Sequence, residues 1–151
     1  MIKLNADKIR GCFDEQKVVY DEREMGFICL KRAPVCVSLL LAYIEIQFDG
    51  EDMCAKEISG LSPKGTWKKA RLAKPENVLK GALKLEENFE WGVYRLDADD
   101  GWETFYDEGS GWVCVGEPDS AADGSNINFI SNAIATIDKK GELKALWIKL
   151  I

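Results

Sequence analysis

The sequence predicts a single α+β domain over residues 1–151, with a mostly antiparallel β-sheet, a C-terminal meander of hairpins and one or two short helices. Three observations predict this fold class. Several segments alternate apolar and polar residues, which is the period of a half-buried strand. Turn-forming residues that include glycine separate the strand segments of the C-terminal third. No long helical pattern lies between these strands, which disfavours a parallel sheet built from strand–helix–strand units.

The composition is that of a globular protein with its own core. The chain has 151 residues, of which 46% are hydrophobic and 30% charged, and its net charge is −6. A chain of this length buries about 68–70% of its unfolded surface. It contains no histidine, which excludes a Ser-His-Asp triad, a Cys-His pair and any metal site with a histidine ligand.

Helices are predicted in only a few places. Residues 5–13 fit one or two amphipathic turns, with Ile9 and Phe13 on one side. Thr66 is a suitable N-cap for a short helix over 67–73, because its hydroxyl can accept a hydrogen bond from the first helical turn. Residues 76–86 fit either a helix that begins at a proline or a strand with alternate leucines inward, and the sequence leaves both alternatives open.

The strand predictions depend on alternation and on turn residues. Residues 42–48 place Ile44, Ile46 and Phe48 on one face, and residues 90–97 carry strand-forming aromatic and β-branched side chains. Two hairpins follow, and a loop is predicted over 117–126 between them. The first hairpin has strands over 102–106 and 112–116, joined by a glycine-rich loop over 107–111. The second has the strands AIATID and ELKALWIKLI, joined by a turn at Lys139–Gly141.

The cysteines and the apolar segments predict a reduced, cytoplasmic protein. The first ten residues lack the apolar run of a secretory signal. The most apolar stretch, 33–44, has 12 residues, whereas a membrane span needs about 20, so a buried strand and no membrane association are expected. The five cysteines contain no CxxC pair, which predicts free thiols and no zinc site.

Charge is distributed unevenly along the chain. Residues 96–138 hold ten acidic residues and no basic one, whereas 1–95 hold 16 basic and 15 acidic residues. Aromatic residues lie within the same acidic block. Carboxylates of one sign attract a basic partner, and aromatic side chains among them supply interface contacts. The predicted partner-binding residues are Asp97, Asp99, Asp100, Trp102, Glu103, Asp107, Glu108 and Trp112. The alternative is that these acids only keep the protein soluble.

Two local patterns within the acidic block have simple structural interpretations. Asp97 and Glu108 are spaced like the first and last ligands of an EF-hand loop, but Trp102 occupies the position where that loop needs glycine. A turn between strands is therefore favoured, and no metal site is predicted. Cys114 lies between two valines, far from any cation in the sequence, so a packed core cysteine is expected rather than a reactive thiolate.

A basic run surrounds Trp67, and it consists of Lys64, Lys68, Lys69, Arg71 and Lys74. Basic residues beside an aromatic ring can bind single-stranded nucleic acid. The chain is acidic overall, however, whereas nucleic-acid-binding domains are usually basic. The run is therefore expected to be a solvated helix face or a complement to the acidic block within the fold, and no nucleic-acid partner is expected.

These observations favour a protein-binding function over catalysis. No catalytic residues and no cofactor are predicted, and the most concrete hypothesis is an immunity protein or antitoxin that blocks the cationic surface of a nuclease-type toxin. Two alternatives remain: a β-rich enzyme or small-ligand binder that uses carboxylates or a metal, and a structural subunit whose segment 33–44 forms an oligomer interface. The sequence does not specify the oligomeric state.

Overall fold

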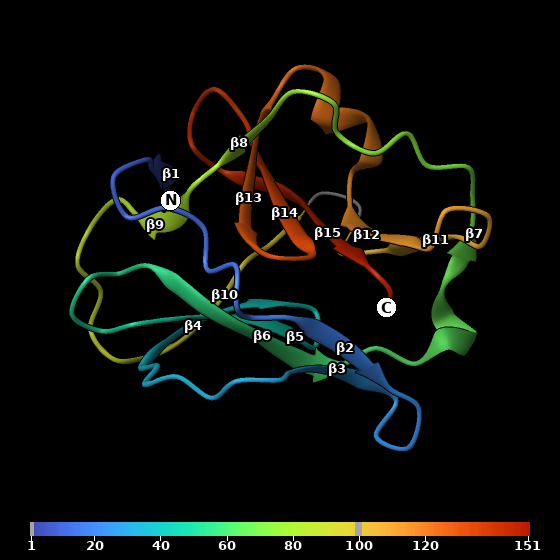
Figure 1. Ribbon diagram of the computed structural model, residues 1–151, viewed down its shortest axis with the longest axis horizontal. Helices are drawn as coiled ribbons and strands as arrows, with labels where there is room; N and C mark the ends of the chain where they lie inside the picture. Colours follow the sequence, from blue (N-terminus) through green and yellow to red (C-terminus); the bar gives the residue numbers. More distant parts are fainter. Residues whose placement is uncertain (1, 99–100) are drawn as a thin grey trace.

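Two β-sheets lie face to face, and the main hydrophobic core fills the space between them (Figure 1). The computed structural model describes residues 2–98 and 101–151. Both sheets contribute fully buried side chains to this core, such as Ile46 and Ile58 from one sheet and Phe129 and Leu146 from the other. The two layers are therefore one folding unit around one core.

The first sheet has six strands, mostly from the N-terminal half of the chain. In spatial order these strands are β10 (Gly92–Arg95), β4 (Val37–Leu41), β5 (Ile44–Phe48), β6 (Ala55–Leu61), β3 (Gly26–Cys29) and β2 (Val18–Asp21).

The second sheet has seven strands, mostly from the C-terminal half. In spatial order they are β7 (Lys68–Lys69), β11 (Thr104–Asp107), β12 (Trp112–Gly116), β15 (Leu143–Lys149), β14 (Ala133–Ile137), β13 (Ser125–Ile130) and β8 (Val78–Lys80).

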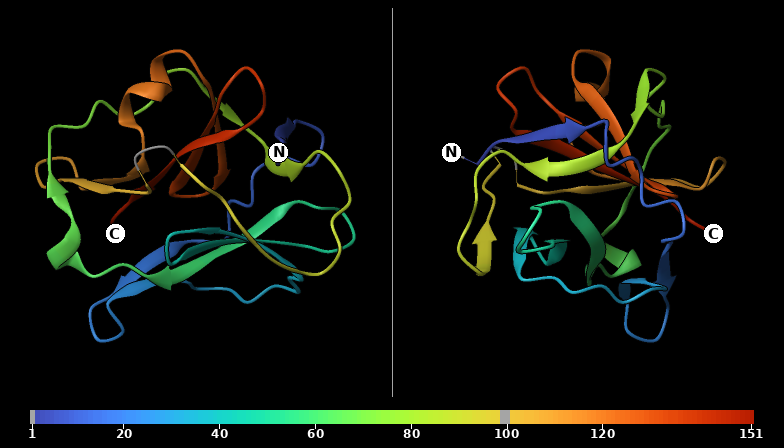
Figure 2. Two further views of the ribbon diagram at one scale, coloured as in Figure 1. Left: turned by 180° about the vertical axis from the view of Figure 1, so that it is seen from behind. Right: turned by 60° about the vertical axis from the view of Figure 1, so that its left-hand side comes forward.

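A third, two-stranded sheet connects the two layers at one end. It pairs β1 (Leu4–Asp7) with β9 (Ala82–Leu85) in antiparallel fashion, and Figure 2 shows the two strands side by side. The N–H of Gly81 donates to the carbonyl of Asn128 in the seven-stranded sheet, at 3.2 Å. The N–H of Leu85 donates to the carbonyl of Met53 beside the six-stranded sheet, at 2.9 Å.

The strands with clear alternation form where the sequence predicts them. In β5, Ile44, Ile46 and Phe48 face the core, while the intervening Glu45 and Gln47 are only partly buried. The predicted hairpins form as β11–β12 and β14–β15, and Gly141 in the second turn adopts a φ of +87°. Segment 33–44 contributes β4, whose inward side chains are buried in the chain's own core.

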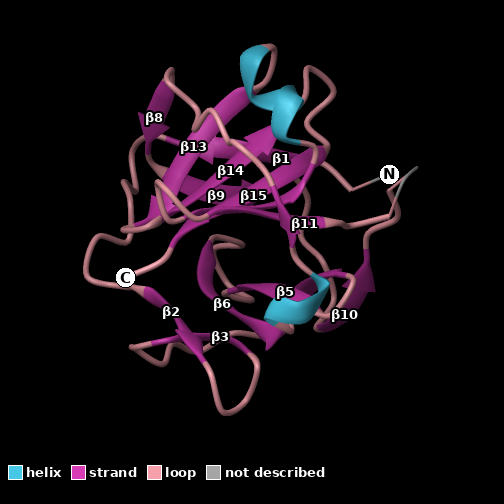
Figure 3. Ribbon diagram, turned by 90° about the vertical axis from the view of Figure 1, so that its right-hand side faces the viewer, coloured by secondary structure: helices cyan, strands magenta, loops and turns pink. Residues whose placement is uncertain are grey.

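The predicted α+β class is wrong, because the protein is nearly all β. Within the described residues, helix is confined to two 3₁₀ segments, Lys64–Thr66 (η1) and Pro118–Ala122 (η2) (Figure 3). The helix expected over 67–73 is extended, and residues 76–86 form strands β8 and β9. Residues 5–13 begin in β1 and leave Ile9 exposed. In β1 and β7, pairing with a strand distant in sequence outweighs the local helical preference, and over 76–86 such pairing decides between the two open alternatives.

The sheets are mainly antiparallel, as expected, but three pairings are parallel. They join β10 to β4, β7 to β11 and β8 to β13. Each places a short strand at the edge of a sheet. Three of the four edges of the two large sheets are therefore made by segments that return from elsewhere in the chain, which the sequence pattern does not reveal.

A strap, residues 70–77, crosses the outer face of the seven-stranded sheet. It joins β7 and β8, which lie at opposite edges of that sheet (Figure 1). Beneath the strap lies a second apolar cluster, to which Leu72 of the strap contributes. The buried members of this cluster are Cys114, Ile134, Ala145 and Trp147. The seven-stranded sheet therefore has apolar contacts on both faces.

Candidate functional site

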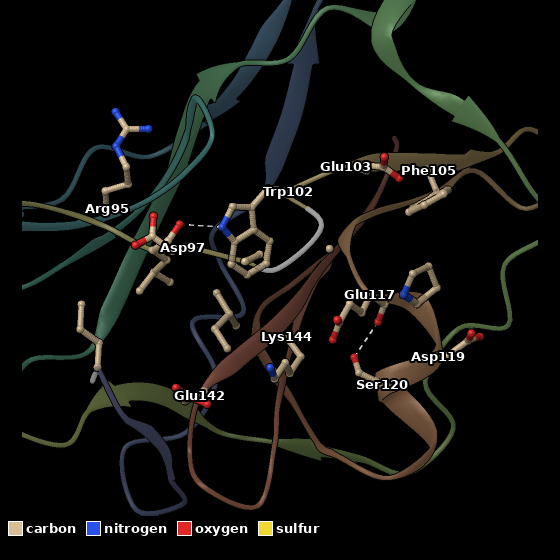
Figure 4. Close-up of a pocket in the computed structure, with 17 residues that line it drawn as sticks. Arg95, Asp97, Trp102, Glu103, Phe105, Glu117, Asp119, Ser120, Glu142 and Lys144 are labelled. Carbon is tan, nitrogen blue, oxygen red and sulfur yellow. Dashed lines mark hydrogen bonds between the residues drawn. The ribbon is translucent and has the colours of Figure 1, made fainter.

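A pocket of about 940 Å³ opens where the end of β10 approaches the start of β11 (Figure 4). Its walls come from the segment after β10, the first turn of η2 and the start of β15. The pocket is lined by Ile2, Arg95, Leu96, Asp97, Ala98, Gly101, Trp102, Glu103, Phe105, Gly116, Glu117, Pro118, Asp119, Ser120, Glu142, Leu143 and Lys144.

Acidic residues dominate the charge of this pocket. Two cations, Arg95 and Lys144, face five carboxylates: Asp97, Glu103, Glu117, Asp119 and Glu142. Figure 4 shows Asp97 on one side of the pocket and Glu117 and Asp119 on the other. Because like charges arranged around one hollow add their potentials, the pocket favours a cation. One of the two cations, Lys144, also forms an ion pair with Asp138, which is not a lining residue, and its Nζ lies 3.9 Å from Asp138 Oδ2.

Trp102 forms a fixed wall of the pocket rather than a protruding side chain. Its indole Nε1 donates a hydrogen bond to the carbonyl of Leu96 at 2.8 Å, and its ring packs against the main core. The ring lies so close to Gly116 that a Cβ there would be 2.9 Å from it, and Gly116 has a φ of +112°. Glycine at this position therefore leaves room both for the Trp102 ring and for the main-chain carbonyl of Lys144, which would be 2.4 Å from a Cβ.

Glu103 and Phe105 project from the opposite face of the same segment, as the alternation of strand residues predicts. Both line the pocket, and Glu103 is exposed. Tyr106, on the same face as Trp102, packs against the core. This segment therefore has one face packed on the core and another that presents an acid beside an aromatic ring.

The structure divides the predicted partner-binding residues into two groups. Asp97, Trp102 and Glu103 line the pocket. Asp99 and Asp100 lie outside the described residues. The remaining predicted residues, Asp107, Glu108 and Trp112, lie at the turn end of the β11–β12 hairpin, away from the pocket.

The residues at the far end of the hairpin make contacts within the chain. Asp107 accepts hydrogen bonds from the main-chain N–H groups of Leu72, Ser110 and Gly109, and that of Leu72 does most to hold the pKa of this carboxyl below its usual range. Trp112 packs edge-to-face on Trp147, with ring centroids 6.5 Å apart. These side chains shape the hairpin and its contact with the strap.

Two lysines of the basic run complement the acidic block, as one of the two expectations proposed, whereas Lys64 pairs with Glu22 outside the block. Lys68 Nζ lies 2.9 Å from Glu103 Oε1, and Lys69 Nζ lies 3.7 Å from Glu108 Oε2. The parallel pairing of β7 with β11 brings these lysines beside the acids. The other expectation, a helix face, is wrong because the helix expected over 67–73 does not form: Lys68 and Lys69 lie in β7, and Lys64 lies in the short 3₁₀ segment η1.

Three acidic lining residues were not predicted, namely Glu117, Asp119 and Glu142. Glu117 and Asp119 belong to the same acidic block, so their charge was visible in the sequence. Their approach to Asp97 depends on the return of β12 and on η2, which spacing does not indicate. Glu142 enters the pocket from the start of β15, outside the acidic block, and no sequence signal marks it.

The cysteines are all free, and the expectation of a core cysteine at position 114 is confirmed. Cys114 is fully buried, and this burial raises the pKa of its thiol. Within the described ranges, no three Asp, Glu or Cys side chains are grouped so that they could hold a metal ion.

The described part of the chain contains no helix long and apolar enough to cross a membrane. No protein-family model matches this chain, and no curated protein matches it.

Proposed function

We propose that this protein is an acidic binding module that neutralises a basic protein partner, in the manner of an immunity protein or antitoxin directed against a nuclease-type toxin. The observation that carries the proposal is the pocket with five carboxylates around it and only two cations. Nuclease surfaces that bind nucleic acid are cationic, so an acidic surface can cover them and exclude the substrate.

The position of the carboxylates supports a protein partner. They come from separate elements around an open hollow, and four of the five belong to the block that has no lysine or arginine. A lysine or arginine side chain entering the hollow would approach several carboxylates at once. Phe105 and Trp102 add apolar wall area, and contact with aromatic rings stabilises a guanidinium or ammonium group.

Internal ion pairing limits which acids a partner can use. Glu103 is already paired with Lys68 at 2.9 Å, whereas Asp97 and Asp119 are exposed and make no ion pair within the described part of the chain. Asp97, Glu117 and Asp119 are therefore the acids that we assign to the partner. The proposal also places the protein in the cytoplasm, where its five free thiols stay reduced.

The test compares a pocket variant with a control of the same charge. The pocket variant carries Asp97→Asn, Glu117→Gln and Asp119→Asn. The control carries Glu24→Gln, Glu51→Gln and Glu76→Gln, which neutralise three exposed acids outside the pocket. Each tagged protein is used to capture partners from native lysate at low and high salt, with mass spectrometry as the readout.

We expect the wild type and the control to retain one basic protein stoichiometrically at low salt, and the pocket variant to lose it. Reconstitution from purified components, with inhibition of the captured protein's activity, completes the test. The proposal is wrong if the pocket variant retains the same protein as well as the control does, because the acids would then serve solubility alone.

The size of the pocket favours a second candidate, a small cationic ligand. Ligand pockets have volumes of about 300–1,000 Å³, and this pocket is within that range at about 940 Å³. A thermal shift with spermidine distinguishes the candidates. A rise in melting temperature that the pocket variant lacks and the control keeps supports ligand binding.

A further inference from the structure

The outer edge of β10 has unpaired main-chain groups. The N–H of Gly92 donates to the carbonyl of Cys36, just before β4, at 3.0 Å, and the N–H of Leu96 donates to the carbonyl of Leu40 in β4, at 2.9 Å. Hydrogen-bonding direction alternates along a strand, so the main-chain groups of Val93 and Arg95 point away from β4. Within the described residues, no hydrogen bond engages them. A second strand could therefore pair with β10 on this side.

The other edges of the two large sheets are protected. At β2, the side-chain amide of Asn132 occupies the place of a neighbouring strand, because it bonds both the N–H and the carbonyl of Val18, at 2.9 and 2.8 Å. Strands β7 and β8 have only two and three residues, and each contains a lysine paired with an acid. Short length and lysines are devices that disfavour edge pairing.

Two large apolar side chains are exposed at the β10 edge, together with the charged Arg95. Trp91, which precedes β10, is 72% exposed and Val93 is 61% exposed. The indole of Trp91 lies against Gly50, where a Cβ would be 2.5 Å from the ring nitrogen and 3.1 Å from the Cβ of Cys36. An exposed aromatic ring beside an open strand edge offers apolar contact to an added strand.

The charge around this edge favours a basic occupant over a second copy of the chain. Exposed Glu86, Glu87, Glu90 and Asp97 flank the strand, and Arg95 is the only cation of segment 86–97. Pairing of β10 with its counterpart in a second copy would bring two acidic segments together, which is unfavourable. A segment that carries lysine or arginine would instead meet opposite charge.

The edge also leads directly into the acidic pocket. The chain runs from β10 through Leu96 to Ala98, and residues 95–98 form one wall of that pocket. We propose that β10 accepts an extended, basic segment of the partner as an added strand, and that this segment delivers a lysine or arginine side chain into the pocket. This inference rests on the proposed function, and it specifies how the partner binds.

The decisive variant is Val93→Pro, which removes the outward N–H group. The donors to β4 are on neighbouring residues, so the internal ladder keeps its hydrogen bonds, and proline is tolerated at such an edge position. The preceding residue is Gly92, which has no Cβ to clash with the proline ring. Val93→Thr is the matched control because it keeps the N–H group. Val93→Lys keeps it too, and repels a basic segment.

The probe is a display library of random 12-residue peptides, selected on the wild-type protein. We expect the selected peptides to alternate lysine or arginine with β-branched residues. Synthesised peptides should bind Val93→Thr within about twofold of the wild type, and both Val93→Pro and Val93→Lys at least tenfold more weakly. On binding, the amide hydrogens of Val93 and Arg95 should become protected from exchange, while that of Tyr94 stays protected throughout.

Several results would overturn the inference: selected peptides that are not basic, no selection at all, or equal affinity for the wild type and both Val93→Pro and Val93→Lys. A wild type that sediments as a dimer, with a monomeric Val93→Pro variant, assigns the edge to a second copy instead. The proposed function fails separately, when the pocket variant of Asp97, Glu117 and Asp119 retains the basic partner. If the pocket variant loses the partner while Val93→Pro and Val93→Lys keep it, only the strand-addition inference is wrong.

Discussion

The carboxylate of Asp107 accepts a hydrogen bond from the main-chain N–H of Leu72, at 3.0 Å, and so joins the β11–β12 hairpin to the strap. The same carboxylate accepts the N–H of Gly109 within its own turn. The side chain of Leu72 packs on the second apolar cluster under the strap. One acid of the acidic block therefore holds together two segments that lie 35 residues apart in the sequence.

The pKa of Asp107 gives the first prediction. Because the folded protein lowers this pKa, the carboxylate stabilises the fold at pH values above its unfolded pKa of about 3.9. The stabilisation is lost as the pH falls through the lower, folded value. We expect the urea midpoint of the wild type to fall between about pH 5 and pH 2.5 more steeply than that of Asp107→Asn.

The control for this titration is Asp119→Asn, which removes an exposed acid whose carboxylate accepts no hydrogen bond within the described residues. Its midpoint should fall with pH as steeply as that of the wild type. If Asp107→Asn also matches the wild-type slope, the hydrogen bond to Leu72 does not contribute to acid sensitivity.

The ion pair between Lys68 and Glu103 gives the second prediction. Both side chains are partly exposed, at 59% and 44%, so the pair adds at most about 1 kcal/mol to stability. Lys68→Met should hardly change the urea midpoint, yet it frees a pocket carboxylate. We expect it to bind the basic peptides selected on the wild type more tightly, by isothermal titration at low salt. Equal or weaker binding would show that Glu103 plays no part in recognition.

Asn132 gives the third prediction, since it connects the two sheets through main-chain contacts. Its amide bonds both polar groups of Val18, and its Nδ2 also donates to the carbonyl of Lys149 at 2.8 Å. Asn132→Ala leaves these groups without partners and should lower the unfolding free energy by about 1–3 kcal/mol in urea. Ser131→Ala, at the exposed neighbouring position, should stay within about 0.5 kcal/mol.

The alternation of residues and the positions of turn glycines predicted those parts of the fold that depend on neighbouring residues. The buried face of β5 and the turn at Gly141 follow from alternation and from a glycine that adopts a positive φ. The strap and its edge strands depend on pairing with distant partners, such as Lys68 with Phe105. No periodicity within 64–80 indicates this arrangement, so the sequence predicts a helix over 67–73 instead and fits either a helix or a strand over 76–86.

The candidate site follows the same division. The acidic block showed that Asp97 and Glu103 belong to a charged surface, because their charge is a property of composition. The hollow itself exists because β12, η2 and β15 meet at one end of the sheet, which brings Glu142 beside acids of the block. The meeting of these three elements depends on tertiary packing, which the spacing of residues in the sequence does not indicate.

A buried polar network under η2 gives the fourth prediction. The hydroxyl of Thr136 donates to Asn126 Oδ1 at 2.6 Å and accepts a hydrogen bond from Trp147 Nε1 at 3.2 Å. Asn126 in turn donates to the carbonyl of Ala121, at the end of η2. The network therefore links the centre of the seven-stranded sheet to the element that carries Asp119 into the pocket.

Thr136→Val keeps the shape of the side chain but removes the hydroxyl, so two buried groups lose a partner. We expect the unfolding free energy to fall by about 1–3 kcal/mol, measured by urea titration with tryptophan fluorescence. Thr136→Ser keeps the hydroxyl and loses one methyl group, which costs about 0.8 kcal/mol. Because the valine variant also loosens the anchorage of η2, it should bind the selected basic peptides more weakly than Thr136→Ser does. A valine variant that is as stable as the wild type and binds the peptides equally well would show that the network positions neither the sheet nor the pocket.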